Sequence, residues 1–481
     1  MLNRVAPLSA APATAINRRA PERAGAVLWA VVLAVAVVAL SAPAFWNGFP
    51  LLQYDTGGYL ARWYEGYLVP SRPGAYGLVL AATVPLHFWP LVLLQSGLAV
   101  WVLALVLRCL GCGGRPLIFV AIVGVLSLLT TLPWLTAILL TDIFAGLAVL
   151  ALHLLVVRAE LLARYERWGL IWLVAFAAAA HSATLVLVGA LALTVALVWL
   201  VAAPVVPRRG VQRALTAAVF GIIMTLAANF VVAGKVAWTP GGYGILFGRM
   251  LEEGIVDRYL AKHCRETPFK LCPFRRQLPH DADTFLWASD IFDRLGRFAG
   301  LGEEMRTIVL GSLREYPVQQ ATAALRATAR QLVHVASGEG VLTTMWHTYG
   351  IMERYTPSVV PAMRAARQQH GELSFTAINL IHVPVALFAI AMLPLLVVLG
   401  WRWAPLAPVG SLAATLAVAV LANAVICGAL ANPHNRYGAR LAWLAPLTLV
   451  LVPVTIGFPR RNTNAAPAAS ALKRDAPSPV G

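Results

Sequence analysis

Long stretches without formal charge alternate with short basic segments along the chain. A membrane-spanning helix takes about 20 consecutive apolar residues. Five uncharged stretches match one such crossing, and they are 24–46, 89–107, 214–234, 376–400 and 441–458. Residues 403–435 hold one more span and an exposed end. Since backbone polar groups in a bilayer must be satisfied internally, we predict that these segments are α-helices.

The first of two longer uncharged stretches, 116–157, is about twice the length of one crossing at 1.5 Å per residue. Asp142 is its only formally charged residue. A Leu-Pro-Trp-Leu sequence around Pro133 lies near its middle, and proline interrupts a helix because it lacks an N–H and clashes with the preceding turn. We therefore predict a helical hairpin in which Asp142 lies just beyond the turn, at the start of the returning helix.

The second long stretch, 168–207, is predicted to form another hairpin. Its turn lies either at the Ala-Ala-His-Ser step around His181 or at Gly189. A short apolar segment, 74–86, is expected to be partly embedded. The predicted fold class is therefore an all-α polytopic membrane protein with about ten transmembrane helices, within a range of about 10–12.

Composition agrees with this fold class. Hydrophobic residues make up 59% of the 481 residues and charged residues 12%, whereas a soluble domain has about 25% charged residues. The net charge of +17 does not indicate nucleic-acid binding, because it gathers between the spans. With a cytoplasmic N-terminus, the cytoplasmic segments hold 17 basic and four acidic residues, as the positive-inside rule requires. These segments are 1–23, 108–115, 158–167, 208–213, 401–402 and 460–481. The tail from 459–481 is rich in Ala, Pro and Asn and is expected to be disordered.

The outer side then holds a first loop, 48–88, and a hydrophilic segment, 237–375, that is long enough to fold as a mainly helical domain. An outward location permits a disulfide between Cys264 and Cys272, the alternative being two free thiols. Apolar residues at near-helical spacing over 317–335 predict an interfacial helix. Short helices in this domain are expected to form a lid over the site.

Two acids are expected on the outer face. Asp55 stands among aromatic residues and glycines directly after the first span, and a partly desolvated carboxylate suits general-base work. The alternative is that Asp55 caps an interfacial helix, and the same two interpretations hold for Asp142. As a pair, one carboxylate would deprotonate an acceptor hydroxyl while the other positions that acceptor or a metal ion.

Two cations and a histidine complete the candidate chemistry. Arg72 and Arg436 are outward cations near the membrane boundary, where a lipid-linked phosphate would arrive. Their alternative role is interfacial anchoring by snorkelling. His181 is a lone histidine on a hydrophobic helix, for which the alternative is a satisfied core residue. Ionisable residues at membrane depth are costly and favour a functional hypothesis.

Five short motifs follow one another along the chain, and all are expected on this outer side. They are Asp55 after the first span, the Arg-Pro-x-x-Tyr-like segment from Arg72, Asp142 opening the fourth span, the His-Ser step at His181 and Asn-Arg-Tyr at 435–437. In this order they resemble the GT-C superfamily of polytopic glycosyltransferases. That superfamily uses polyprenyl-phosphate-linked sugars and includes protein mannosyltransferases and the aminoarabinose transferase of lipid A. The resemblance covers the membrane core, 24–236, and the C-terminal helices, 376–458.

The resemblance implies roles for these residues. Asp55 would be the general base toward the acceptor, and Asp142 would support the acceptor or a divalent cation, Mg²⁺ or Mn²⁺. Many relatives place a second acid beside the first, and Tyr54-Asp55-Thr56 lacks one, so no cofactor is certain. The remaining roles are donor-phosphate binding by Arg72, Arg436 and Tyr437, and substrate contact by Tyr59 and His181.

The expected function is transfer of a hexose or pentose from a polyprenyl-phosphate carrier to a hydroxyl of an envelope glycan, lipid or protein. The reaction would occur at the periplasmic face of the bacterial inner (plasma) membrane, with both termini cytoplasmic. Partners would be the donor, the acceptor and membrane lipids, with no nucleic acid. The alternatives are a flippase or transporter of lipid-linked glycans, which the lack of an internal repeat disfavours, a glycan ligase and a non-catalytic assembly subunit.

Overall fold

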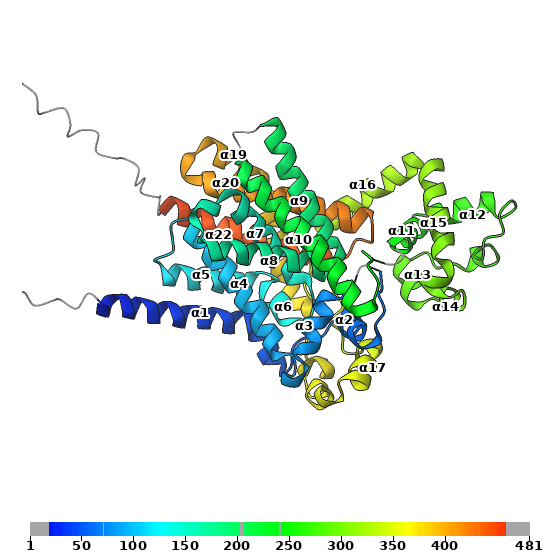
Figure 1. Cartoon of the computed structure of the whole chain (residues 1–481), viewed down its shortest axis with the longest axis horizontal. Coiled ribbons are helices and arrows are strands. Elements are labelled where there is room, and N and C mark those ends of the chain that lie inside the picture. Colours follow the sequence, from blue (N-terminus) through cyan, green and yellow to red (C-terminus); the bar gives the residue numbers. More distant parts are fainter. Residues whose placement is uncertain (1–18, 71, 203–205, 240–241, 458–481) are drawn as a thin grey trace, which may run out of the picture.

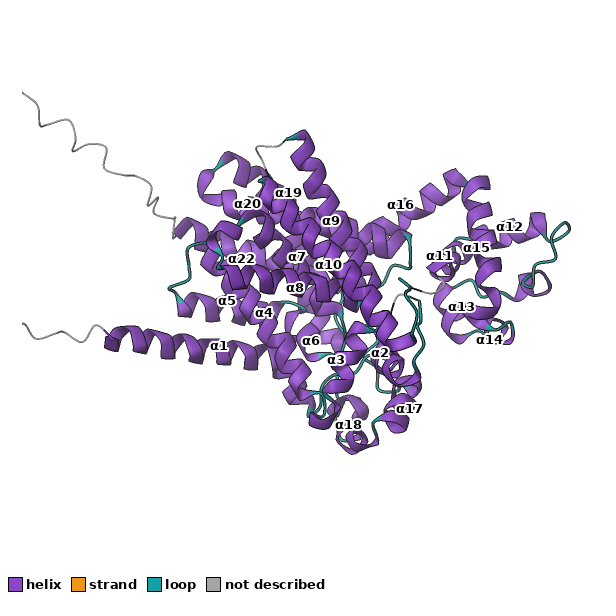
Figure 2. Ribbon diagram, in the orientation of Figure 1, coloured by secondary structure: helices purple, strands orange, loops and turns teal. Residues whose placement is uncertain are grey.

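The computed structural model describes residues 19–70, 72–202, 206–239 and 242–457. Most of the expected basic leader and the whole tail from 459–481 therefore lie outside the described residues. Within these ranges most of the chain is helical, and extended backbone pairs only in two isolated bridges. Figure 2 shows the helices joined by short loops. The all-α class predicted from the sequence is confirmed.

Seven helical segments among the described residues are long and apolar enough to cross a membrane. The protein is therefore a multi-pass membrane protein. The segments are Gly25–Asn47 within α1 (Arg19–Asn47), α4 (Trp89–Cys109), α9 (Ser182–Val201), α10 (Arg208–Ala233), α19 (Phe375–Arg402), Ala404–Ala429 including α20 (Ala407–Ala424), and Asn435–Gly457 comprising α21 (Asn435–Ala442) and α22 (Leu444–Gly457). Two shorter apolar helices are α5 (Pro116–Leu129) and α7 (Asp142–Val157).

Both long uncharged stretches break near their middles. The first forms α5, a short α6 (Leu132–Ala137) with its proline in the first turn, and α7, whose first residue is Asp142. The second forms α8 (Arg164–Ala180) and α9, and it turns at His181, which is extended (φ −151°, ψ 126°). Gly189 lies inside α9, so the alternative turn at Gly189 is wrong: a single extended residue at His181 already reverses the chain.

The first outer loop folds into α2 (Tyr54–Glu65), α3 (Ala75–Ala82) and a 3₁₀ turn. Gln53 caps α2, since its side chain accepts the N–H of Asp55 at 2.7 Å. The capping role considered for Asp55 is therefore filled by another residue. Leu51 pairs with the backbone ahead of α7 through the Ala137 carbonyl (3.0 Å) and the Leu139 N–H (2.9 Å). This bridge holds the start of α2 beside the start of α7.

The segment 237–375 was predicted to be one domain, yet its halves join two different hydrophobic clusters. Its first half folds around a core of its own within 247–309, which stands apart from the membrane helices in Figure 1. Its second half packs into the main core through Met345, Met352 and Met363, because α17 (Trp346–Tyr355) lies on α2. The helices of the first half are α11 (Gly242–Glu252), α12 (Ile255–His263), α13 (Ala282–Ala288), α14 (Asp290–Arg294) and α15 (Arg297–Glu315).

A long helix, α16 (Pro317–Val333), joins these two halves where the interfacial helix was expected. It packs against a π-helical turn (Val425–Ala429) at the end of α20. A Cβ on Gly428 would lie 2.7 Å from the Ala327 carbonyl oxygen, so only glycine permits this close approach. In the outer half-domain, Cys264 and Cys272 are joined by a disulfide.

Helices α19 and α20 approach through facing glycines, since a Cβ on Gly410 would lie 2.7 Å from the Gly400 Cα. We expect Gly410→Ala to destabilise the protein by about 1–3 kcal/mol through overpacking. Gly189→Ala is the matched control, because nothing lies within 4 Å of its Cβ position and the change favours a helix by about 0.5–1 kcal/mol. Thermal unfolding in detergent measures both. An unchanged melting temperature in Gly410→Ala would contradict the close contact.

Candidate functional site

The four charged residues expected on the outer face form one connected network. Arg436 donates from Nη1 to Asp55 Oδ2 at 2.5 Å and from Nε to Asp142 Oδ2 at 2.7 Å. Arg72 donates to the other oxygen of Asp55. The side chains of Asp142 and Arg436 are 4% and 6% exposed, and those of Asp55 and Arg72 12% and 18%. The two acids thus share one guanidinium at the edge of the membrane core.

Local structure explains why these side chains meet. Asp55 and Asp142 lie in the first turns of α2 and α7, and Arg436 lies in the first turn of α21. The Thr56 hydroxyl adds a 3.0 Å bond to the Leu139 carbonyl, which reinforces the bridge between the two aspartate-bearing helices. Three helix starts therefore converge, and helix N-termini favour negative charge.

The balance of charge in this network decides the protonation state of Asp55. Burial by itself raises the pKa of this carboxyl, but the guanidinium groups of Arg72 and Arg436 lower it to about 2. Asp55 is therefore ionised at neutral pH. The stability that its ion pairs contribute is present above the ordinary pKa and is lost as the pH falls through about 2.

A third acid, which sequence reasoning missed, joins the network. Glu339 accepts the backbone N–H of Arg436 at 2.6 Å and Nδ1 of His434 at 2.9 Å. Nε2 of His434 pairs in turn with Asp283 of α13 at 3.1 Å. Trp287 of α13 also stacks on the Arg72 guanidinium at 5.0 Å. The outer half-domain is thus tied to the site at two points, through Asp283 and Trp287.

The remaining sequence-predicted residues surround the network. Tyr59 is 1% exposed, and its hydroxyl lies 3.5 Å from that of Thr141. The Tyr437 ring lies 5.7 Å from the guanidinium carbons of both Arg436 and Arg440. His181 is 6% exposed, and its Nδ1 has no hydrogen-bond partner.

Arg440, one helical turn after Arg436, is a second buried cation that sequence reasoning missed. It is 0% exposed and donates to Asn423 Oδ1 at 3.0 and 2.5 Å and to Cys427 Sγ at 3.2 Å. Its spacing from Arg436 on one helix was the available signal, because residues four apart share a helix face.

A divalent cation fits the two aspartates poorly. The Arg436 guanidinium already binds one oxygen of each carboxylate, and Asp142 Oδ1 is the one oxygen of this acid pair without a partner. The residues that the structure describes contain no group of three His, Cys, Asp or Glu side chains suited to a metal ion. We derive no step through a metal.

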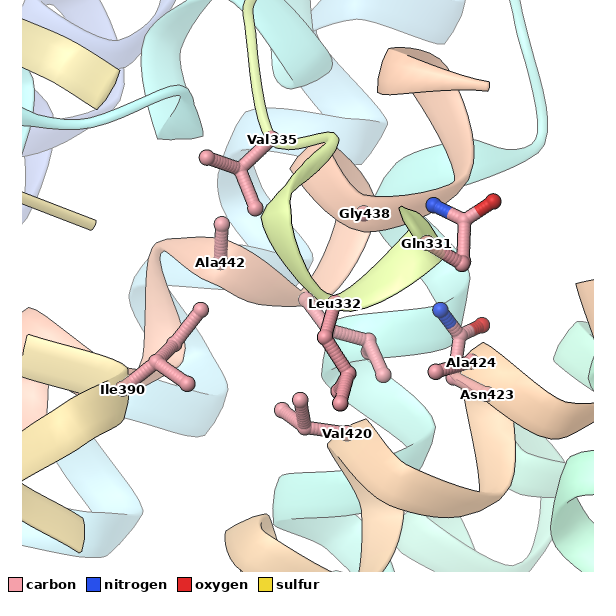
Figure 3. A pocket seen from close by; sticks show the side chains of 10 residues that line it. Gln331, Leu332, Val335, Ile390, Val420, Asn423, Ala424, Gly438 and Ala442 are labelled. Atoms are coloured by element: carbon pink, nitrogen blue, oxygen red, sulfur yellow. The ribbon is translucent and has the colours of Figure 1, made fainter. Parts of the chain in front are cut away.

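Two hollows lie near the network without containing it. Figure 3 shows a recess of about 10 Å³ where α16, α19, α20 and α21 meet, with the amides of Gln331 and Asn423 beside apolar side chains. A wider hollow of about 580 Å³ lies along α17 and is lined by Trp346, Tyr349 and Arg364 among others.

No protein-family model matches this chain, and no curated protein or solved structure shows significant similarity to it. The likeness to GT-C enzymes therefore remains an expectation from the motifs.

Removing one member of the acid pair should destabilise the fold. We expect Asp142→Asn to lower the free energy of unfolding by about 3 kcal/mol or more, because it leaves a buried guanidinium without a full counter-charge. The control Asp257→Asn removes an exposed partner of Arg275, and exposed pairs contribute only about 0–1 kcal/mol. Chemical denaturation of the purified protein compares the two. Equal losses would contradict the buried network.

The contact through His434 should depend on pH. Burial lowers the pKa of His434, but its bonds to Asp283 and Glu339 raise it to about 10. This pKa lies above the ordinary value of 6.5. The stability that protonated His434 contributes through Asp283 and Glu339 is therefore fully present below pH 6.5, and it is lost as the pH rises through about 10. We expect proteolysis of the α11–α15 cluster to accelerate above pH 10 in the wild type. In His434→Gln it should be fast already at pH 7, and a wild-type profile in that variant would contradict the role of His434.

Proposed function

We propose that this protein is a membrane glycosyltransferase of the GT-C type that transfers a sugar from a polyprenyl-phosphate carrier to an acceptor hydroxyl. The single observation that carries the proposal is that Asp55 and Asp142 lie on either side of Arg436 at one edge of the membrane core. Such paired carboxylates with adjoining cations suit proton removal beside an anionic leaving group. The order of the motifs along the chain supports the same assignment.

The proposed topology has ten crossings with both termini in the cytoplasm. The seven long apolar segments are completed by α5 and α7, which are shorter but apolar, and by α8, which carries no formal charge over 168–180 and packs on α7 and α10. The distribution of basic residues supports this orientation. It puts the network and the disulfide of Cys264 and Cys272 outside, on the periplasmic face of a bacterial inner membrane.

The reaction we propose begins from a neutral resting network of two carboxylates and two guanidinium groups. A lipid-linked phosphate competes with Asp55 for Arg72 and Arg436, and loss of these partners makes Asp55 more basic. Asp55 then accepts the acceptor's hydroxyl proton as that oxygen forms a bond to the anomeric carbon. The bond from this carbon to the phosphate oxygen breaks with inversion, and the lipid phosphate leaves with the electron pair. Tyr59, His181 and Tyr437 surround the network in which this exchange is proposed.

A flippase of lipid-linked glycans is the second candidate. The buried charges at the edge of the bundle favour an enzyme, since a translocation route would require polar residues along its length. A glycan ligase would use the same carboxylates on a larger donor, and a non-catalytic subunit would use none of them.

The enzyme proposal is tested by mass spectrometry of envelope lipids, glycans and secreted proteins from cells with and without the gene. We expect one hexose or pentose increment to be missing without the gene. In cells carrying Asp55→Asn the increment should also be missing, while the variant is still inserted in the membrane. The matched control is Asp257→Asn, an exposed acid paired with Arg275, which should restore the increment. Wild-type transfer by Asp55→Asn would overturn the assigned base.

A further inference from the structure

The wide hollow along α17 takes no part in the proposed reaction, although α17 packs on α2, the helix that carries Asp55. Its volume of about 580 Å³ falls within the range of about 300–1,000 Å³ that ligand sites commonly have. Figure 2 shows α17 close to α18 (Val360–Arg364), whose last residue lines the hollow. The two helices thus border a space of the size that a small ligand fills.

The walls of the hollow carry planar polar groups that other contacts hold in place. Arg364 is paired with Glu353, and its guanidinium carbon lies 5.2 Å from the centre of the Tyr349 ring. The Tyr349 hydroxyl donates to the Thr343 carbonyl at 2.7 Å. Three more polar side chains line the hollow, and they are Thr344, Gln369 and His370. Because the charges of Glu353 and Arg364 balance, these walls offer hydrogen-bond donors and acceptors with little net charge.

Trp346, the first residue of α17, adds an aromatic ring to these walls. It is 82% exposed and lines the hollow. Tryptophans at a membrane surface commonly face lipid as anchors, whereas most of the other side chains around this ring's hollow are polar. The ring therefore offers an apolar platform to a ligand that is otherwise polar.

Helix α17 is fixed against the start of α2 by its third residue. Thr348 Oγ1 donates to the Tyr54 carbonyl at 2.9 Å and accepts the N–H of Gly57 at 3.3 Å. A Cβ on Gly57 would lie 2.6 Å from the Thr348 Cα, so the two backbones touch. These contacts lie on either side of Asp55 and set the distance between the hollow and that acid.

His347 lies between the hollow and the charged network. Its ring meets the Trp346 ring edge to face at 5.7 Å. Partial burial lowers the pKa of His347, and Arg72, the partner of Asp55, is the charged group that lowers this pKa most. The first residues of α17 therefore lead from the hollow toward the proposed base.

The hollow and the network lie on opposite faces of α17. Trp346 and Glu353 line the hollow, whereas Thr348 and Ile351 face α2. With 3.6 residues per turn, these two pairs point in roughly opposite directions. A helix with its side chains is about 10–12 Å across, so a sugar in the hollow is not the sugar whose hydroxyl meets Asp55. A ligand that reaches both places must consist of several units.

We propose that the hollow along α17 binds one sugar unit of the acceptor, which is therefore an oligosaccharide. This inference rests on the proposed function and names the class of its acceptor. A pyranose ring has C–H groups on its faces, which pack on an aromatic ring such as that of Trp346. Its hydroxyls both donate and accept hydrogen bonds, as the Glu353 carboxylate and the Gln369 amide require. The balanced charge of the walls favours a neutral sugar.

Binding without transfer tests the hollow. Neutral oligosaccharides are released from the envelope of cells without the gene and separated by size. They are titrated into the full-length protein in detergent while the melting temperature is followed. We expect at least one size fraction to stabilise the wild type. Single sugars from complete hydrolysis of that fraction should bind at least about tenfold more weakly, because they cannot extend from the hollow to the network.

Trp346→Ala should lower the affinity for the active fraction about tenfold or more, as for loss of a stacking platform. Because the ring is exposed, this variant should keep the wild-type melting temperature without ligand. Trp346→Phe keeps a smaller ring and should lose less affinity. The matched control is Trp401→Ala, which removes a tryptophan that is 85% exposed at the end of α19 and should bind as the wild type does.

Several results would overturn the proposal. These are binding of no fraction by the wild type, wild-type affinity in Trp346→Ala, and equal losses in Trp346→Ala and Trp401→Ala. Equal affinity for single sugars would overturn the extended acceptor. A missing sugar increment that belongs to a protein or to a lipid without a glycan would overturn the acceptor class and leave the glycosyltransferase standing. Cells without the gene that lack no increment would contradict the glycosyltransferase and leave the binding result standing.

Discussion

The bond between Arg436 and two aspartates is the interaction on which the outer edge of this protein depends. One guanidinium joins helices that are nearly 300 and nearly 400 residues apart in sequence, since Arg436 binds Asp142 and Asp55. Each charge is too buried to be tolerated alone. The starts of α2, α7 and α21 must therefore meet for any of the three charges to be satisfied. The Leu51 bridge and the Gln53 cap fix the backbone that makes this possible.

This network also explains the placement of the outer half-domain. Glu339 and His434 extend the line of charges from Arg436 to Asp283, and Trp287 lies on Arg72. A small helical cluster with its own core is held to the membrane core by polar contacts at the site. Contacts of this kind can break and form again with little loss of buried apolar area, in contrast to the close glycine contacts of α16 and α19.

The two buried arginines of α21, Arg436 and Arg440, differ in the charge of their partners. Arg436 is neutralised by carboxylates of the chain itself. Arg440, one turn further along the helix, is held by the neutral acceptors Asn423 and Cys427.

The sequence by itself determined the membrane character, the helical class, the break at Pro133 and the position of Asp142 at a helix start. These follow from long uncharged stretches and from proline, which act locally along the chain. It also singled out Asp55, Arg72, Asp142 and Arg436, because charges are rare in so apolar a chain. Only the tertiary structure decided that these four bind one another, that Gln53 caps α2, that 237–375 divides between two cores, that Glu339 joins the network and that Arg440 is buried one turn further along α21. Those outcomes depend on which distant helix ends converge, and residue type and local spacing carry no information on that.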